Sequence, residues 1–152
     1  MDLDNYKSVL IPAASLFVGI FGGFVAFYYK ATIDTRERIA RSLSDFYSSA
    51  AAVYYARQEY ASTSDEDEDC LVFYKLYDQH YKEFLSASTF LASIVPPDLV
   101  EEILKVEDEW ESINELGFTS ASSKKWFNTL DAVRYLILGK IRHGPISFFP
   151  WK

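Results

Sequence analysis

The stretch that decides the fold is VLIPAASLFVGIFGGFVAFYY, residues 9–29. It contains 21 residues and no Asp, Glu, Lys or Arg. At 1.5 Å of rise per residue, an α-helix of that length spans about 30 Å, which is the thickness of the hydrocarbon core of a bilayer. We therefore expect residues 9–29 to form a single N-terminal transmembrane helix.

A signal peptide and a buried core helix both fit this stretch less well. A cleaved signal peptide has a positively charged leader, a shorter apolar stretch and small residues at its exit. Here the leader is MDLDNYK and the stretch ends in AFYYK. A buried core helix seldom runs this long with no polar residue stronger than Ser15.

The charges that flank the stretch predict its orientation. Only one cationic side chain, Lys7, precedes it. Four cations follow it closely: Lys30, Arg36, Arg38 and Arg41. Because Lys and Arg collect on the cytoplasmic side of spanning helices, we expect an extracytoplasmic N-terminus (residues 1–8) and a cytoplasmic C-terminal domain, in an inner or plasma membrane. The residues that suit the lipid–water interface at the inner end are Tyr28, Tyr29 and Lys30.

The stretch has two different sides when it is drawn as a helix. One side, which we call the small-residue face, consists of Ser15, Gly19, Gly22, Gly23 and Ala26. The opposite side carries Phe17, Phe21, Phe24 and Tyr28. Small residues let the backbone of another spanning helix come close, so this face predicts packing against another membrane protein or a second copy of the chain. The alternative is that these glycines reflect only the general frequency of glycine in spanning helices.

Apolar side chains recur every three or four positions in four later segments: about 32–61, 67–94, 98–116 and 122–143. This spacing predicts amphipathic helices. No Gly or Pro separates the first of them from the stretch at 9–29, so the two could form one rod. Because short loops favour antiparallel neighbours, we expect an all-α fold in which residues 30–144 form an antiparallel (up-down-up-down) four-helix bundle.

Particular residues are expected at the ends of the third and fourth segments. Asp98 suits the N-cap of the third, and Gly117 suits its C-terminal cap. Ser120 or Ser122 is expected to open the fourth. The third segment is acidic and the fourth basic. Antiparallel packing of the two predicts ion pairs that join Glu111 and Glu115 to Lys124 and Lys125.

The last eight residues, 145–152, form an aromatic tail that includes Phe148, Phe149 and Trp151. In the up-down-up-down topology the fourth helix returns toward the membrane, so the tail is expected at the bilayer surface, where aromatic side chains and a terminal lysine are stable. The alternative is that the tail covers the core of the bundle.

Tyrosines gather on the first two helices of the expected bundle in larger number than a core needs. The residues that we predict for a protein interface are Tyr47, Tyr54, Tyr55, Tyr74, Tyr77 and Tyr81. Half-exposed aromatic surface is typical of protein interfaces. The alternative is a tyrosine-rich core and rim.

The sequence contains no complete metal-binding motif. Asp65, Asp67 and Asp69 follow the one-three-five pattern of a calcium loop, but Cys70 stands where that loop needs Gly and Leu76 where it needs Glu. A solvated linker accounts better for this acidic run. Cys70 is the only cysteine, so it forms no internal disulfide, and we expect it to be a small buried apolar group.

Catalytic motifs are also missing from the sequence. Neither His80 nor His143 follows a Glu by three positions, as a di-iron bundle requires. There is no Gly-rich phosphate loop or Gly-x-Ser-x-Gly turn. The formal charge of −7 opposes general binding of nucleic acid. We therefore expect that the chain is not an enzyme and that it binds no cofactor, metal or small-molecule substrate.

The remaining features favour a membrane-anchored protein-interaction module, such as an accessory subunit, a regulator or an immunity-type protein. Its expected partners are membrane lipid and another membrane protein or its own copies. One alternative is a self-assembling pore-forming or membrane-perturbing effector, which would use the small-residue face. Another is an enzyme with an unrecognised site.

Overall fold

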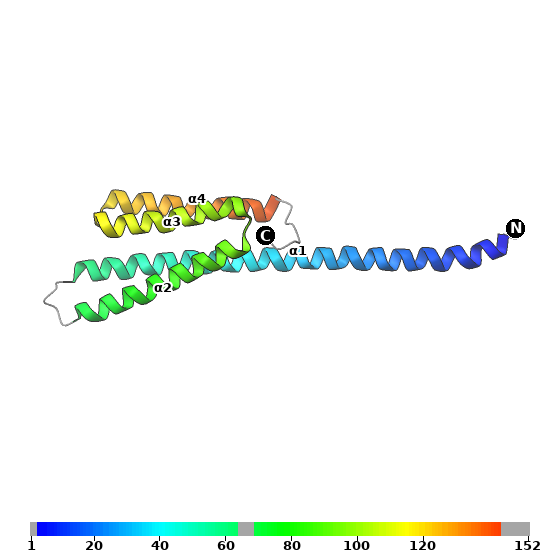
Figure 1. The fold of residues 1–152 in the computed structure, drawn as a ribbon, viewed down its shortest axis with the longest axis horizontal. Coiled ribbons are helices and arrows are strands. Elements are labelled where there is room, and N and C mark those ends of the chain that lie inside the picture. Colours follow the sequence, from blue (N-terminus) through cyan, green and yellow to red (C-terminus); the bar gives the residue numbers. More distant parts are fainter. Residues whose placement is uncertain (1–2, 64–68, 144–152) are drawn as a thin grey trace. The chain divides into compact units, whose positions relative to one another are not determined.

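In the computed structural model, residues 3–63 and 69–143 are described, with their side chains from Ser15 onward except at Leu116 and His143. These residues form four α-helices and no strand: α1 (Leu3–Ser62), α2 (Cys70–Ile94), α3 (Pro97–Leu116) and α4 (Ser120–His143) (Figure 1). The prediction of an all-helical chain with a long, apolar first helix is confirmed. The chain divides into two compact units, Met1–Arg36 and Glu37–Lys152.

Helix α1 contributes residues to both units. Between Gly23 and Ser62 the sequence contains no Gly or Pro, so nothing in it ends the helix early. Helix α1 ends before the acidic run 64–68, which lies outside the described residues.

The second unit is a helical bundle around a single apolar core. From α1 the core receives residues that recur at steps of four and three, as the predicted helical spacing requires: Ile39, Leu43, Phe46, Ala50 and Val53. From α3 and α4 it receives Leu99, Ile103, Val106, Trp110, Ile113, Trp126, Leu130, Val133 and Ile137. Each of these side chains is at most 4% exposed. The predicted apolar stripes of α1, α3 and most of α4 are therefore the core, because the helical period of 3.6 residues keeps such positions on one side.

Helix α2 is less deeply inserted than its sequence pattern predicts. Its C-terminal half buries Phe84, Ser88 and Leu91, but Tyr74 is 49% exposed and Cys70 is only partly buried. The expectation that Cys70 is a buried apolar group is wrong. It stands at the first position of α2, beyond the last turn that the core covers.

Large aromatic side chains occupy the centre of the bundle. Trp110 and Trp126 have ring centroids 4.8 Å apart, and Phe84 lies 5.6 Å from Phe46 and 6.4 Å from Trp126. The indole Nε1 of Trp126 donates a hydrogen bond of 3.0 Å to the carbonyl oxygen of Val106. Each such aromatic pair adds about 0.5–1.5 kcal/mol beyond the area that it buries, so this cluster is a principal source of the bundle's stability.

The turn between α3 and α4 contains the predicted Gly117 cap and one of the two serines that were expected to open α4. Gly117 has a φ of 95°, which side chains rarely tolerate, and its N–H donates to the carbonyl of Ile113 at 3.0 Å. Helix α4 begins at Ser120, as one of the two alternatives predicted, and the preceding residue Thr119 caps it. The Thr119 Oγ1 accepts from the Ser122 N–H at 3.1 Å, and the Ser122 Oγ accepts from the Thr119 N–H at 3.0 Å.

The predicted N-cap of α3 is wrong by two residues. The helix begins at Pro97 and its N-cap is Pro96, so Asp98 lies in the first helical turn. Proline at the start of a helix loses no hydrogen bond, because the first N–H groups have no partner within the helix. Asp98 instead forms an ion pair of 2.5 Å with Lys140 of α4.

Candidate interaction surfaces

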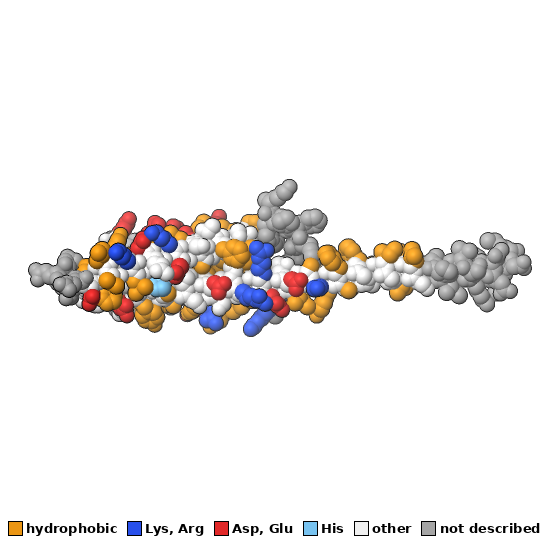
Figure 2. Space-filling view, turned by 90° about the horizontal axis from the view of Figure 1, so that it is seen from below, with side chains coloured by type: hydrophobic (Ala, Val, Ile, Leu, Met, Phe, Trp, Pro, Cys, Tyr) orange, Lys and Arg blue, Asp and Glu red, His pale blue; other side chains and the backbone are white. Residues whose placement is uncertain are grey.

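The first candidate surface is the small-residue face of α1. Ser15, Gly19, Gly22, Gly23 and Ala26 are all exposed. A Cβ added to any of the three glycines would meet no atom within 4 Å. The large side chains of the same segment, Leu16 to Tyr29, are 49–71% exposed, and Figure 2 shows hydrophobic side chains on the surface of this segment.

One helix in the described part of the chain is long and apolar enough to cross a membrane, judged by length and composition. An 18-residue window of the segment Ser15–Ser62 has a mean hydropathy of 1.5, and none of that window is buried. Tyr28, Tyr29 and Lys30, at the C-terminal end of the apolar stretch 9–29, are exposed. The other residues predicted for the lipid interface, Phe148, Phe149 and Trp151, lie outside the described residues.

The predicted tyrosine surface is divided between the core and the solvent. Tyr47, Tyr54, Tyr77 and Tyr81 pack as partly buried side chains against the core. Tyr55 and Tyr74 are 61% and 49% exposed. The structure thus brings most of these tyrosines into internal contacts, and the two exposed ones offer the most surface to a partner.

Tyr54 is the centre of an aromatic cluster that joins α1 to α4. Its ring centroid lies 4.8 Å from that of Phe127, 5.3 Å from Phe118 and 6.1 Å from Trp126. The exposed ring of Tyr55 meets it edge-on at 5.5 Å. Most of the Tyr54 ring surface is therefore used within the bundle.

Tyr47 joins α1 to α4 by polar contacts. Its hydroxyl donates a hydrogen bond of 3.0 Å to Asp131 Oδ1, and the guanidinium carbon of Arg134 lies 5.0 Å from its ring centroid. Burial, and after it the hydrogen bond to the Asp131 carboxylate, raises the pKa of Tyr47 above its ordinary value of 10.0. The cation of Arg134 therefore rests on an aromatic ring rather than on a carboxylate.

A cluster around Arg57 joins α1, α2 and α3, and the sequence pattern gave no sign of it. Arg57 Nε donates to Asn114 Oδ1 at 3.1 Å, and Asn114 Nδ2 donates to the Tyr77 hydroxyl at 2.8 Å. The guanidinium carbon lies 5.4–5.8 Å from the ring centroids of Tyr60, Tyr77 and Phe118. Distances in this range are typical of cation–π contacts, which stabilise a half-buried cation without a carboxylate.

Tyr81 continues this aromatic row on α2. Its ring centroid lies 6.1 Å from that of Tyr77. Burial, with the nearby charge of Glu111 as the next cause, raises the pKa of Tyr81 above 10.0. Glu111 therefore faces α2 rather than α4, and the predicted ion pairs need correction.

Besides the Asp98–Lys140 pair, a second ion pair between α3 and α4 joins Lys125 Nζ to Glu109 Oε1 at 3.1 Å. The prediction had joined Lys124 and Lys125 to Glu111 and Glu115. Within a helix, residues two positions apart point about 160° away from each other. Glu109 and Glu111 therefore face different neighbours, which loop length alone could not predict.

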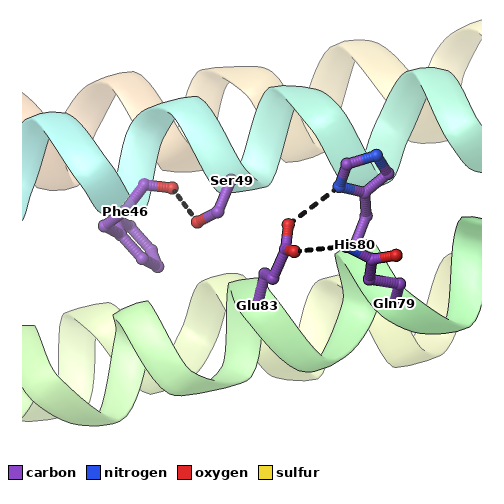
Figure 3. Close-up of polar contacts among 5 residues, drawn as sticks. All are labelled: Phe46, Ser49, Gln79, His80 and Glu83. Atoms are coloured by element: carbon purple, nitrogen blue, oxygen red, sulfur yellow. Dashed lines mark hydrogen bonds and ion pairs between the residues drawn. The ribbon is translucent and has the colours of Figure 1, made fainter.

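Polar side chains of α2 form local contacts along the helix. His80 Nδ1 lies 3.0 Å from Glu83 Oε2, and Gln79 Nε2 donates to Glu83 Oε1 at 2.9 Å (Figure 3). These contacts, first that of Gln79 and then that of His80, hold the pKa of the Glu83 carboxyl below its ordinary value of 4.5. On α1, which faces these residues in Figure 3, Ser49 Oγ donates to the carbonyl of Phe46 at 2.9 Å. Within residues 15–63 and 69–142, no three His, Cys, Asp or Glu side chains group as metal ligands would.

A further surface, which the sequence interpretation missed, lies on the outside of α4. We call it the α4 outer strip, and it consists of the exposed residues Ala132, Tyr135, Leu136 and Gly139. A second apolar period in residues 132–139, offset from the core positions, was the signal that could have revealed it.

No known protein family, curated protein or solved structure matches this chain.

Proposed function

We propose that the chain is a membrane-anchored protein-interaction module, with one spanning helix over residues 9–29 and a cytoplasmic helical bundle. The observation that carries this proposal is the exposure of the apolar segment of α1. Every described side chain of residues 15–30 is exposed, and Lys30 carries the only charge among them. At about 25 cal/mol per Å² of apolar surface, leaving so many large side chains in water is unfavourable, and a bilayer removes that cost.

The bundle is proposed to follow the up-down-up-down order of antiparallel neighbours. Two ion pairs support it for the last two helices: Lys140, near the end of α4, meets Asp98, at the start of α3, whereas Lys125, near the start of α4, meets Glu109. On α1 and α2, the contact of Tyr60 with Tyr74 near the connecting loop and that of Phe46 with Phe84 farther away follow the same order.

Interaction rather than catalysis is proposed because of the surfaces themselves. The small-residue face leaves room for a second spanning helix. In the bundle, Tyr55 and Tyr74 remain exposed beside rings that are packed inside. The partner of the spanning helix is proposed to be another membrane protein or a second copy of this chain.

The single native cysteine gives a direct test of the orientation. Cys70 is partly exposed, so a maleimide reagent can reach it. A membrane-impermeant maleimide is expected to label Cys70 only after the cells are permeabilised. As a matched control, Ser8→Cys in a Cys70→Ser background should be labelled in intact cells. Labelling of Cys70 in intact cells would place the bundle outside and contradict the orientation.

The interaction itself is tested by purification of the full-length chain in a mild detergent. A second polypeptide, or a second copy, should stay with it through size-exclusion chromatography. Gly19→Leu or Gly23→Leu, which fill the small-residue face, should weaken association through the spanning helix, whereas Phe17→Leu on the opposite side should not. A strictly monomeric chain without a partner would count against the proposal.

A further inference from the structure

Helix α4 presents apolar side chains on two opposite sides. At 100° per residue, the four residues of the α4 outer strip fall within about 100° of one another. They point away from Leu130, Val133 and Ile137, which are buried in the core. Tyr135 is 73% exposed and Leu136 is 48% exposed, while Ala132 and Gly139 are exposed as well. The strip therefore does nothing for the core of the bundle.

The shape of the strip suits another helix. Ala132 and Gly139 are seven residues apart, which is two helical turns, and they lie on either side of the larger Tyr135 and Leu136. A Cβ on Gly139 would meet nothing within 4 Å. Small residues at this spacing leave hollows into which the side chains of a second helix can be inserted.

Positive charge borders the strip at both ends. Lys124 and Lys125 precede it and Arg142 follows it, all exposed and on the same side of the helix, although Lys125 already pairs with Glu109 of α3 at 3.1 Å. The single acid of α4 is Asp131, which is half-buried at the edge of the strip and accepts the Tyr47 hydroxyl at 3.0 Å. The strip is thus apolar in its middle and cationic at its ends, in a chain whose net charge is −7.

This charge pattern discriminates between occupants. A second copy docked in parallel would place Lys124 and Arg142 beside their own equivalents, and an antiparallel copy would place Lys124 of each chain beside Arg142 of the other. Like charges across an interface are unfavourable, whereas opposite charges select the partner. A lipid surface is a poorer match than a protein, because Tyr135 and Leu136 are the only large apolar side chains of the strip, too few for an interfacial helix.

We propose that the α4 outer strip is the docking site for an acidic amphipathic helix of another protein. That helix would carry apolar residues at i, i+3 or i+4, and i+7 against the strip, and Asp or Glu near each end, facing Lys124, Lys125 and Arg142. This inference rests on the proposed interaction function and names the partner's chemistry, but it does not require the transmembrane span.

The test places a photocrosslinker in the strip of the full-length chain, in the cells that make it. Tyr135→p-benzoylphenylalanine should yield a covalent adduct with a second polypeptide, whose crosslinked peptide, identified by mass spectrometry, is acidic and has apolar residues at three-four spacing. The same crosslinker at the exposed Asp108 of α3 is the matched control, and it should not yield this adduct.

Charge reversal then tests the electrostatic part of the inference. The double variant Lys124→Glu/Arg142→Glu should reduce the yield of the adduct by about fivefold or more, since each lost pair and each new repulsion weakens docking. Lys105→Glu, an exposed cation on α3, should leave the yield unchanged. Circular dichroism of the variants at matched temperature checks that the bundle remains folded.

Three outcomes would overturn the inference: an adduct only with a second copy of the chain, an adduct only with lipid, or no adduct from Tyr135. A crosslinker at Gly19 separates this failure from that of the proposed function. If Gly19 gives a protein adduct and Tyr135 does not, the interaction function stands and the α4 docking site is wrong.

Discussion

Helix α1 contains two regions that are both helical but opposite in burial. In residues 15–30 every described side chain is exposed, including Phe17, Phe21 and Phe24. In its C-terminal half, Phe46, Ala50 and Val53 are completely buried by the other helices of the bundle. The backbone geometry is the same in both regions, so helix propensity cannot explain the difference.

The sequence period explains it instead. In the C-terminal half, the buried apolar residues recur every three or four positions, and the other positions hold mostly Ser, Ala, Tyr and charged residues, so one side of the helix can be covered by protein while the other faces water. In residues 15–29, apolar and small residues surround the helix. A helix that is apolar all round needs an apolar environment on all sides, which a bilayer supplies and this bundle does not.

The largest expected effect of a substitution lies in the buried region. Trp126→Ala should destabilise the bundle by about 3–5 kcal/mol, since it removes a completely buried ring and leaves a cavity. Phe17→Ala, in the exposed region, should leave the unfolding of the bundle unchanged. Urea unfolding of the full-length chain in detergent micelles, followed by tryptophan fluorescence and circular dichroism, measures both. Equal effects of the two substitutions would remove the contrast between the regions.

The reverse contrast is expected for a charge placed in the exposed region. Ile20→Arg puts a cation near the middle of the stretch 9–29, where it costs about 2.5–3.5 kcal/mol in a membrane. The fraction of the chain recovered with membranes should fall, whereas Ile20→Leu should behave as the parent chain does. An unchanged membrane fraction for Ile20→Arg would indicate that this segment does not lie in lipid.

The turn between α3 and α4 should respond moderately. Gly117→Ala forces a side chain into a backbone with φ of 95°, at a cost of about 1–3 kcal/mol. Because a Cβ at this position has open space, backbone strain alone causes the loss. Gly139→Ala is the control, since it lies in a regular helix with equal space, and it should be neutral or slightly stabilising.

The smallest effect concerns Tyr47, and it depends on pH. Tyr47→Phe removes the hydrogen bond to Asp131 and should cost about 0.5–1.5 kcal/mol near neutral pH. The pKa of Tyr47 is raised in the folded chain, so its contribution is complete below pH 10 and is lost as the pH rises through the folded value. The unfolding free energies of the parent chain and Tyr47→Phe should differ at pH 8 and become equal at strongly alkaline pH. A constant difference would contradict the pKa shift.

Much of the fold could be predicted because periodicity is a local property. The stripes of α1 and α3 follow from the spacing of residues such as Leu43 and Ile103, and Gly117 follows from the need for an unusual φ. The N-terminal half of α2 could not be predicted, because its aromatic spacing is the same whether the core covers it or leaves it at the rim. Tyr74, exposed at 49%, shows the second outcome.

The candidate surfaces were harder to predict because they depend on which side of each helix is covered. Arg57 reads as an ordinary cation in the sequence, and only the packing of three helices surrounds it with Tyr60, Tyr77 and Phe118. Similarly, Tyr135 and Leu136 read as continuations of an apolar helix until the opposite side is found to fill the core. Tertiary contacts, rather than residue types, decide these roles.

The most direct test of the central claim is alkaline extraction of membranes from cells that express the full-length chain, followed by flotation of the pellet in a density gradient. A spanning helix at residues 9–29 predicts that the chain stays with the floating membranes after the alkaline wash and leaves them only in detergent. Recovery of the chain as a soluble protein without detergent would contradict the account.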